Sequence, residues 1–134
     1  MSESSTTQTK QSGAVTWFEV GTPDPEAARA FYGQAFGWTF ESDGPYAIVT
    51  TGEGHPLQGG LADTRMAPAG APQGYAIPYV QVDDVAATCD RVGTLGGTVV
   101  MPATEVPGGI VFAHITDPTG GHLGLWSPPP CRES

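Results

Sequence analysis

The chain has 134 residues, 39% of them hydrophobic and 14% charged, and its formal net charge is −9. This length allows one domain with an ordinary hydrophobic core and is too short for two independent domains of usual size. The negative charge repels phosphate backbones and anionic lipid, so we expect neither nucleic acid nor a membrane as a partner.

The two ends of the chain differ from the rest in composition. Residues 1–12 are polar, rich in serine and threonine, and contain no apolar stretch of the kind found in signal peptides or membrane spans. We predict a disordered polar tail at 1–12, a C-terminal tail at 129–134 and a cytoplasmic location. Cys89 and Cys131 fit no disulfide framework or metal-binding spacing, so both are predicted to be free thiols.

The first predicted helix begins after Asp24, which can cap the helix, and Pro25 suits the first helical position. Gly37 is expected to end it in the left-handed conformation. The helical spacing predicts a buried apolar stripe made of Ala27, Phe31 and Ala35.

The second predicted helix begins after Asp83 or Asp84, either of which could cap it. Gly96 and Gly97 are expected to end it. Its predicted apolar face consists of Val85, Cys89, Val92 and Leu95.

The two helix starts lie 60 residues apart, and the preceding strand and the terminal glycine recur at the same offset, as with Asp24 and Asp84. Three short strand-like runs follow each helix, so each half is predicted to be a βαβββ module in an α+β fold. The predicted domain covers 13–128. Its parts are module one at 13–63, a linker at 64–72 and module two at 73–128.

Three segments carry a family resemblance: WFEVGTPDPEAARAFYGQAFGW, PYVQVDDVAATCDRVGTLGG and FAHITDPTGGHLGLW. Together they resemble the vicinal oxygen chelate superfamily of glyoxalases, bleomycin-resistance proteins and extradiol dioxygenases, over residues 13–128. The resemblance implies two modules that form a cup-shaped, barrel-like sheet around a small molecule. The fold alone does not define an activity, because this superfamily contains both enzymes and binding proteins.

The resemblance also implies where metal ligands would stand. The corresponding positions hold Trp17, Ile77 and Gly124, and a fourth falls near Gln58 or Gly59. Of these side chains only that of Gln58 could coordinate, and one amide oxygen cannot hold a divalent ion that takes three or four protein ligands. We therefore predict neither a metal site nor a cofactor.

If the ligand-equivalent positions face the cup, strand alternation places a set of aromatic and polar side chains inside it. His114 is included, although its face depends on a hairpin register that the sequence leaves open. Such a lining suits a flat, mostly apolar molecule held by stacking and a few hydrogen bonds. The predicted ligand-binding residues are Trp17, Glu19, Gln58, Ile77, Tyr79, Gln81, His114, His122 and Trp126.

The leading hypothesis is a metal-independent protein that captures a small aromatic or cationic molecule, as the resemblance to bleomycin-resistance proteins implies. The alternative is a lyase or isomerase in which Glu19 acts as acid and base, because desolvation beside Trp17 raises the proton affinity of a carboxylate. A non-standard metal site built from Glu19, His114 and His122 is a further alternative. We expect a homodimer, since family members build the cup within one chain or between two.

Overall fold

The computed structural model describes residues 13–41, 46–52, 54–66 and 73–129. The tail predicted at 1–12, most of the tail predicted at 129–134, and positions 67–72 of the predicted linker lie outside these residues.

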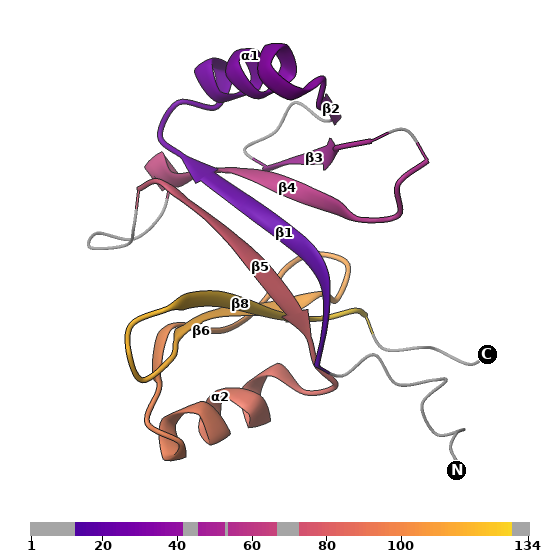
Figure 1. The fold of residues 1–134 in the computed structure, drawn as a ribbon. Coiled ribbons are helices and arrows are strands. Elements are labelled where there is room, and N and C mark those ends of the chain that lie inside the picture. Colours follow the sequence, from indigo (N-terminus) through magenta and orange to yellow (C-terminus); the bar gives the residue numbers. More distant parts are fainter. Residues whose placement is uncertain (1–12, 42–45, 53, 67–72, 130–134) are drawn as a thin grey trace, which may run out of the picture. The chain divides into compact units, whose positions relative to one another are not determined.

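The described chain follows the predicted order of two βαβββ modules, shown in Figure 1. The first module consists of β1 (Ala14–Thr22), α1 (Pro25–Phe36), β2 (Thr39–Glu41), β3 (Tyr46–Thr50) and β4 (Gln58–Asp63). A short 3₁₀ helix, η2 (Thr64–Met66), follows. The second module consists of β5 (Tyr75–Gln81), α2 (Val85–Thr94), β6 (Thr98–Glu105), β7 (Val111–Thr116) and β8 (His122–Ser127). The predicted α+β fold is confirmed.

The chain forms two compact units, which we call the N-terminal unit (Thr16–Pro78) and the C-terminal unit (Met1–Val15 with Tyr79–Ser134). In the N-terminal unit the strands lie in the order β2-β3-β4-β1, followed by the start of β5. In the C-terminal unit the order is β5-β8-β7-β6. Each module pairs its first and last strands in parallel, β1 with β4 and β5 with β8, and its other strands antiparallel.

The helix ends agree with the sequence. Asp24 and Asp84 each accept a hydrogen bond from the backbone N–H three residues later, at 3.1 and 3.0 Å, so Asp84 and not Asp83 caps α2. Pro25 occupies the first turn of α1, and Gly37 ends that helix with φ +80°. These caps are fixed by local sequence, which is why they could be predicted.

The core of the N-terminal unit lies on one face of its strands. Phe18, Ala28, Tyr32, Trp38 and Phe40 pack around the buried residues Val20, Ala47, Val49 and Leu61.

The buried stripe predicted for α1 is wrong. None of its residues is buried, Ala27 and Ala35 are exposed, and Phe31 is 61% exposed. The helix instead turns Ala28 and Tyr32 toward the strands, because the Tyr32 ring stacks on Trp38 with centroids 5.1 Å apart.

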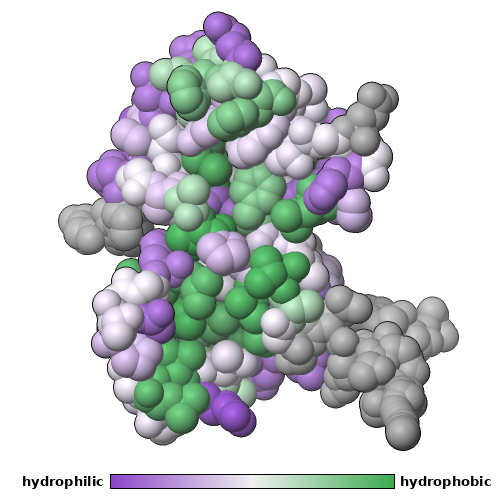
Figure 2. Space-filling model, in the orientation of Figure 1, coloured by the Kyte–Doolittle hydropathy of each residue, from purple (hydrophilic) through white to green (hydrophobic). Residues whose placement is uncertain are grey.

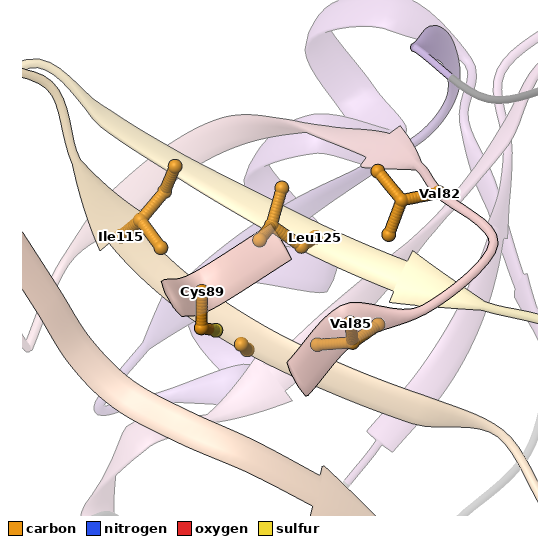
Figure 3. Close-up of a cluster of buried hydrophobic side chains, with 6 residues drawn as sticks. Val82, Val85, Cys89, Ile115 and Leu125 are labelled. Atoms are coloured by element: carbon orange, nitrogen blue, oxygen red, sulfur yellow. The ribbon is translucent and has the colours of Figure 1, made fainter. Parts of the chain in front are cut away.

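The core of the C-terminal unit lies between α2 and the strands, as Figure 3 shows. Val85 and Cys89 are buried there, as predicted, and Val92 is partly buried against them. Leu95 is 71% exposed, which contradicts its predicted place on the apolar face. The cause is that α2 ends at Thr94, so Leu95 is the cap residue and leaves the helical phase. The buried set is Val82, Val85, Cys89, Ala113, Ile115 and Leu125.

Candidate functional site

The carboxylate of Glu19 is the centre of a hydrogen-bonded group in the N-terminal unit. Glu19 lies on β1 opposite Gly60 of β4 and is 6% exposed. Its Oε2 accepts a hydrogen bond from the Tyr75 hydroxyl at 2.5 Å, and its Oε1 accepts one from the Tyr46 hydroxyl at 3.1 Å. Both oxygens of a buried carboxylate are thus met by phenol donors, as burial of charge requires.

A third ring completes this group. The indole N–H of Trp17 donates to the Tyr46 hydroxyl oxygen at 2.9 Å. Tyr46 is 38% exposed, and Trp17 and Tyr75 are half-buried, so the rings lie between the carboxylate and the solvent. We call Trp17, Glu19, Tyr46 and Tyr75 the carboxylate cluster.

The two phenols of the carboxylate cluster are held in their neutral form. Burial, and after it the negative charge of Glu19, raises the pKa of Tyr46 well above its ordinary value of 10.0. The same two causes in the same order raise the pKa of Tyr75. Both hydroxyls therefore keep their protons at neutral pH and remain donors to the carboxylate.

Two glycines provide the space for these rings. A Cβ atom on Gly60 would overlap the Tyr46 ring, and one on Gly21 would overlap the Tyr75 ring. Glycine weakens a strand interior, and it often marks the close approach of another group, as it does here.

An open depression of about 460 Å³ lies beside the carboxylate cluster, within the N-terminal unit. Its walls include Ala28, Phe31 and Tyr32 of α1, and Gly21 of β1. Tyr75 also lines it, so the ring that donates to Glu19 is accessible from this side.

A second polar group lies in the C-terminal unit. The Tyr79 hydroxyl is 2.6 Å from His114 Nε2, and His114 Nδ1 is 3.0 Å from His122 Nε2. In the β7–β8 hairpin His114 pairs with Gly124 and Thr116 with His122, so the two histidines share a face. This register settles what the sequence left open. We call Tyr79, His114 and His122 the histidine relay.

The remaining predicted residues take different positions. Ile77 is buried, while Gln81 and Trp126 are half-buried. Gln58 is exposed, and its side-chain nitrogen donates to Thr50 Oγ1 at 3.2 Å. The structure thus brings Trp17 together with Glu19, and Tyr79 together with both histidines.

Two important residues were missed by the sequence analysis. Tyr75 falls on the same alternation as Ile77 and Tyr79, so strand periodicity could have found it. Tyr46 reaches Glu19 only because β3 pairs with β4 and β4 with β1, and no local pattern reveals that register.

The residues at the positions implied for metal ligands do not fit a metal. The indole N–H of Trp17 is hydrogen-bonded to the Tyr46 hydroxyl. Ile77 has no ligating atom, and aromatic rings cover the other two places, Tyr79 over Gly124 and Phe18 over Gly59. Within the described ranges, no three His, Cys, Asp or Glu side chains are grouped so that they could hold a metal ion.

The duplicated module, with parallel first and last strands and a buried polar group in each unit, defines a two-module α+β protein of the glyoxalase type. A family model described as Glyoxalase/Bleomycin resistance protein/Dioxygenase superfamily matches residues 14–123. The chain belongs to this superfamily, as the resemblance implied.

Curated relatives and a solved structure agree with this assignment. "Putative glyoxylase CFP32" of Mycobacterium bovis is 36% identical over 124 residues, covering 85% of this chain and 45% of the relative. "Anthracycline biosynthesis protein DnrV" of Streptomyces peucetius is 31% identical over 128 residues, covering 85% and 46%. The chain spans about half the length of these relatives. A superfamily member from Vibrio splendidus 12B01 has the same fold, with a TM-score of 0.54, 14% identity, and coverage of 82% of this chain and 94% of that one.

None of the helices in the described residues is both long enough and apolar enough to cross a membrane.

Proposed function

We propose that this chain binds a small aromatic or cationic molecule at the carboxylate cluster, without the metal centre that other superfamily members use. The observation that carries the proposal is the Glu19 carboxylate, which is 6% exposed and hydrogen-bonded to Tyr46 and Tyr75, with the indole of Trp17 on the Tyr46 hydroxyl. A cytoplasmic location remains part of the same proposal.

Physical chemistry favours a cation at this place. The faces of aromatic rings attract cations, and cages of such rings are a known solution for organic ammonium groups. A carboxylate removed from water adds an attraction that solvent screens only weakly. The net charge of −9 also draws cations toward the protein over longer distances.

The names of the relatives support the aromatic part of the proposal. One relative is named for anthracycline biosynthesis, and the superfamily name includes bleomycin resistance. Anthracyclines are flat, fused-ring molecules, and a flat ring system can stack on Trp17 or Tyr46.

The test uses two flat probes of similar size and opposite charge, 9-aminoacridine and anthracene-9-carboxylate, measured by isothermal titration calorimetry. We expect saturable binding of the cation and none of the anion. Glu19→Gln should weaken binding of the cation by about tenfold or more, because interactions with a charged group contribute about 1.5–3 kcal/mol. Glu105→Gln removes the same charge at an exposed position on β6 and should leave the affinity unchanged. Equal affinity for both probes would contradict the attraction of a cation by Glu19, and no saturable binding of either would contradict the proposal as a whole.

The second candidate is an enzyme, a lyase or isomerase in which Glu19 is the acid and base. It is favoured by the two phenol hydroxyls at 2.5 and 3.1 Å from the carboxylate oxygens, which offer a path for a proton. The relative named as a glyoxylase is consistent with it. If Glu19 is the acid and base, the Glu19→Gln variant should still bind a carbonyl ligand. It should no longer catalyse exchange of the ligand's acidic C–H hydrogen for deuterium, which is measured by NMR. If the variant loses both binding and exchange, the result favours a binding protein.

A further inference from the structure

The histidine relay in the C-terminal unit has no part in the proposed binding at Glu19. We infer that it is a separate acid–base site, in which His114 and His122 hold one proton as a unit and exchange it with a weakly acidic molecule, a phenol or an enol, at His122. The inference does not rest on the proposed function, because it uses other residues and its main test needs no ligand.

Both ring nitrogens of His114 are engaged, Nε2 with the Tyr79 hydroxyl at 2.6 Å and Nδ1 with His122 Nε2 at 3.0 Å. A neutral imidazole has one N–H donor and one acceptor nitrogen. The relay therefore has two arrangements. In one, Tyr79 donates to His114 and His114 donates to His122; in the other, His122 donates to His114 and His114 donates to the Tyr79 oxygen.

This arrangement limits how many protons the pair can take up. If both rings were imidazolium, His114 Nδ1 and His122 Nε2 would each carry a hydrogen pointing at the other across 3.0 Å. The hydrogen bond would be lost and two like charges would be in contact. The pair can therefore hold one additional proton with the hydrogen bond kept, whereas a second proton breaks that bond, so protonation is a property of both rings.

The neighbouring strands set the register of the pair. On β7, His114 is opposite Met101 of β6 and Gly124 of β8, and the titratable groups hydrogen-bonded to it are Tyr79 and His122. His122 is opposite Thr116. The nearest carboxyl group along the chain is that of Asp117, which is occupied by N–H groups of its own turn.

The exposed fractions of the three side chains decide which end of the histidine relay meets a ligand. Tyr79 is 3% exposed and His114 is 6% exposed, whereas His122 is half-buried. His122 is thus the catalytic residue, and Tyr79 and His114 are positioning residues. In the transfer, the O–H bond of the phenol or enol breaks and its electron pair stays on oxygen. A new N–H bond forms at His122, and the positive charge is shared with His114.

The chain suits a test by NMR because it has only three histidines, and the third, His55, is an exposed reference in a loop. Ring ¹H and ¹⁵N shifts are followed from about pH 5 to about pH 9, around the ordinary imidazole range. We expect the signals of His114 and His122 to change together, with one shared midpoint for a single proton. Two separate transitions, one for each ring, would overturn the inference.

Tyr79→Phe provides the matched variant, since it removes only the hydroxyl and keeps the ring over Gly124. We expect it to change the His114 tautomer, seen in the ¹⁵N shifts, and to move the shared midpoint by about half a pH unit or more, without affecting His55. An unchanged tautomer and midpoint would show that Tyr79 has no part in the relay.

The ligand class is tested with 4-nitrophenol, whose ionised form is coloured, and with 4-nitroanisole, which has no acidic proton. Millimolar wild-type protein should increase the ionised fraction of 4-nitrophenol at a fixed pH, and His122→Phe should abolish the increase. An ionised fraction that does not respond to wild-type protein would contradict a site for phenols and enols.

Discussion

Aromatic rings that lie directly on glycines shape both polar groups. In each case the missing side chain lets a ring lie against the strand, and the ring then presents its polar atom to a neighbour. These glycines are therefore required for their small size and not for an unusual backbone angle. The pairs are Tyr46 on Gly60, Tyr75 on Gly21 and Tyr79 on Gly124.

Gly60→Ala tests this dependence at the carboxylate cluster. The new methyl group would overlap the Tyr46 ring, so the ring must leave its place beside Glu19. We expect a loss of about 1–3 kcal/mol in the free energy of unfolding, which is typical of overpacking, measured by urea denaturation.

The control is Gly33→Ala in α1, where the added carbon would lie 3.5 Å from the Trp38 carbonyl oxygen, an ordinary contact. Alanine favours a helix interior over glycine, so this variant should gain about 0.5–1 kcal/mol. If Gly60→Ala were as stable as the wild type, the Tyr46 ring would not depend on the glycine.

Strand alternation could predict which residues of one strand share a face, and it did so for Trp17 with Glu19 on β1. It could not predict the partner across strands. Whether His114 faced His122 depended on the register of the β7–β8 hairpin, and Tyr46 reached Glu19 through two strand pairings. Register is a property of the whole sheet, so a single run of residues does not contain it.

At the scale of elements, the two helices show the same limit to what local sequence can predict. Their ends were predicted because caps depend on adjacent residues such as Asp24 and Gly37. The buried face of α1 was not predicted, because it depends on packing partners outside the helix, above all Trp38. The sequence offers aromatic residues on more than one side of α1, and only packing selects between them.

The turn between β7 and β8 is closed by one carboxylate. Asp117 Oδ1 accepts hydrogen bonds from the N–H groups of Thr119 and Gly121 at 2.8 and 2.9 Å, and from the Thr119 hydroxyl at 2.9 Å. These bonds, with that of Gly121 the largest cause, lower the pKa of Asp117 below its ordinary value of 3.8. The ionised form therefore stabilises the fold.

The sign of the pH dependence follows from the lowered pKa. The contribution of Asp117 is fully present above its unfolded pKa, near 3.8, and is lost as the pH falls through its folded pKa. We expect Asp117→Asn to have a lower Tm than the wild type at neutral pH, and the difference to shrink below about pH 4. Differential scanning calorimetry across this pH range measures the difference in Tm between the two proteins. If this difference stays constant with pH, the charged form of Asp117 is not the stabilising one.

At the scale of the whole molecule, part of the apolar surface of α1 is largely exposed in the described chain. Phe31 and Phe36 of α1 are 61% and 60% exposed, and Figure 2 shows hydrophobic residues at the surface over this helix. Large exposed apolar side chains that lie together are typical of interaction sites. The curated relatives are about twice as long as this chain.

We propose that in this chain a second copy covers α1, which gives the homodimer expected from the sequence. Sedimentation velocity should find the wild type as a dimer and the double variant Phe31→Ser with Phe36→Ser as a folded monomer, because burial of each ring contributes about 1.5–3 kcal/mol to association. Leu95→Ser is the control, since Leu95 is 71% exposed in the C-terminal unit and should not change the assembly. A wild type that sediments as a monomer at high concentration would exclude the dimer. A double variant that remains dimeric would place the interface on another surface, because the two rings supply most of the exposed aromatic area of α1.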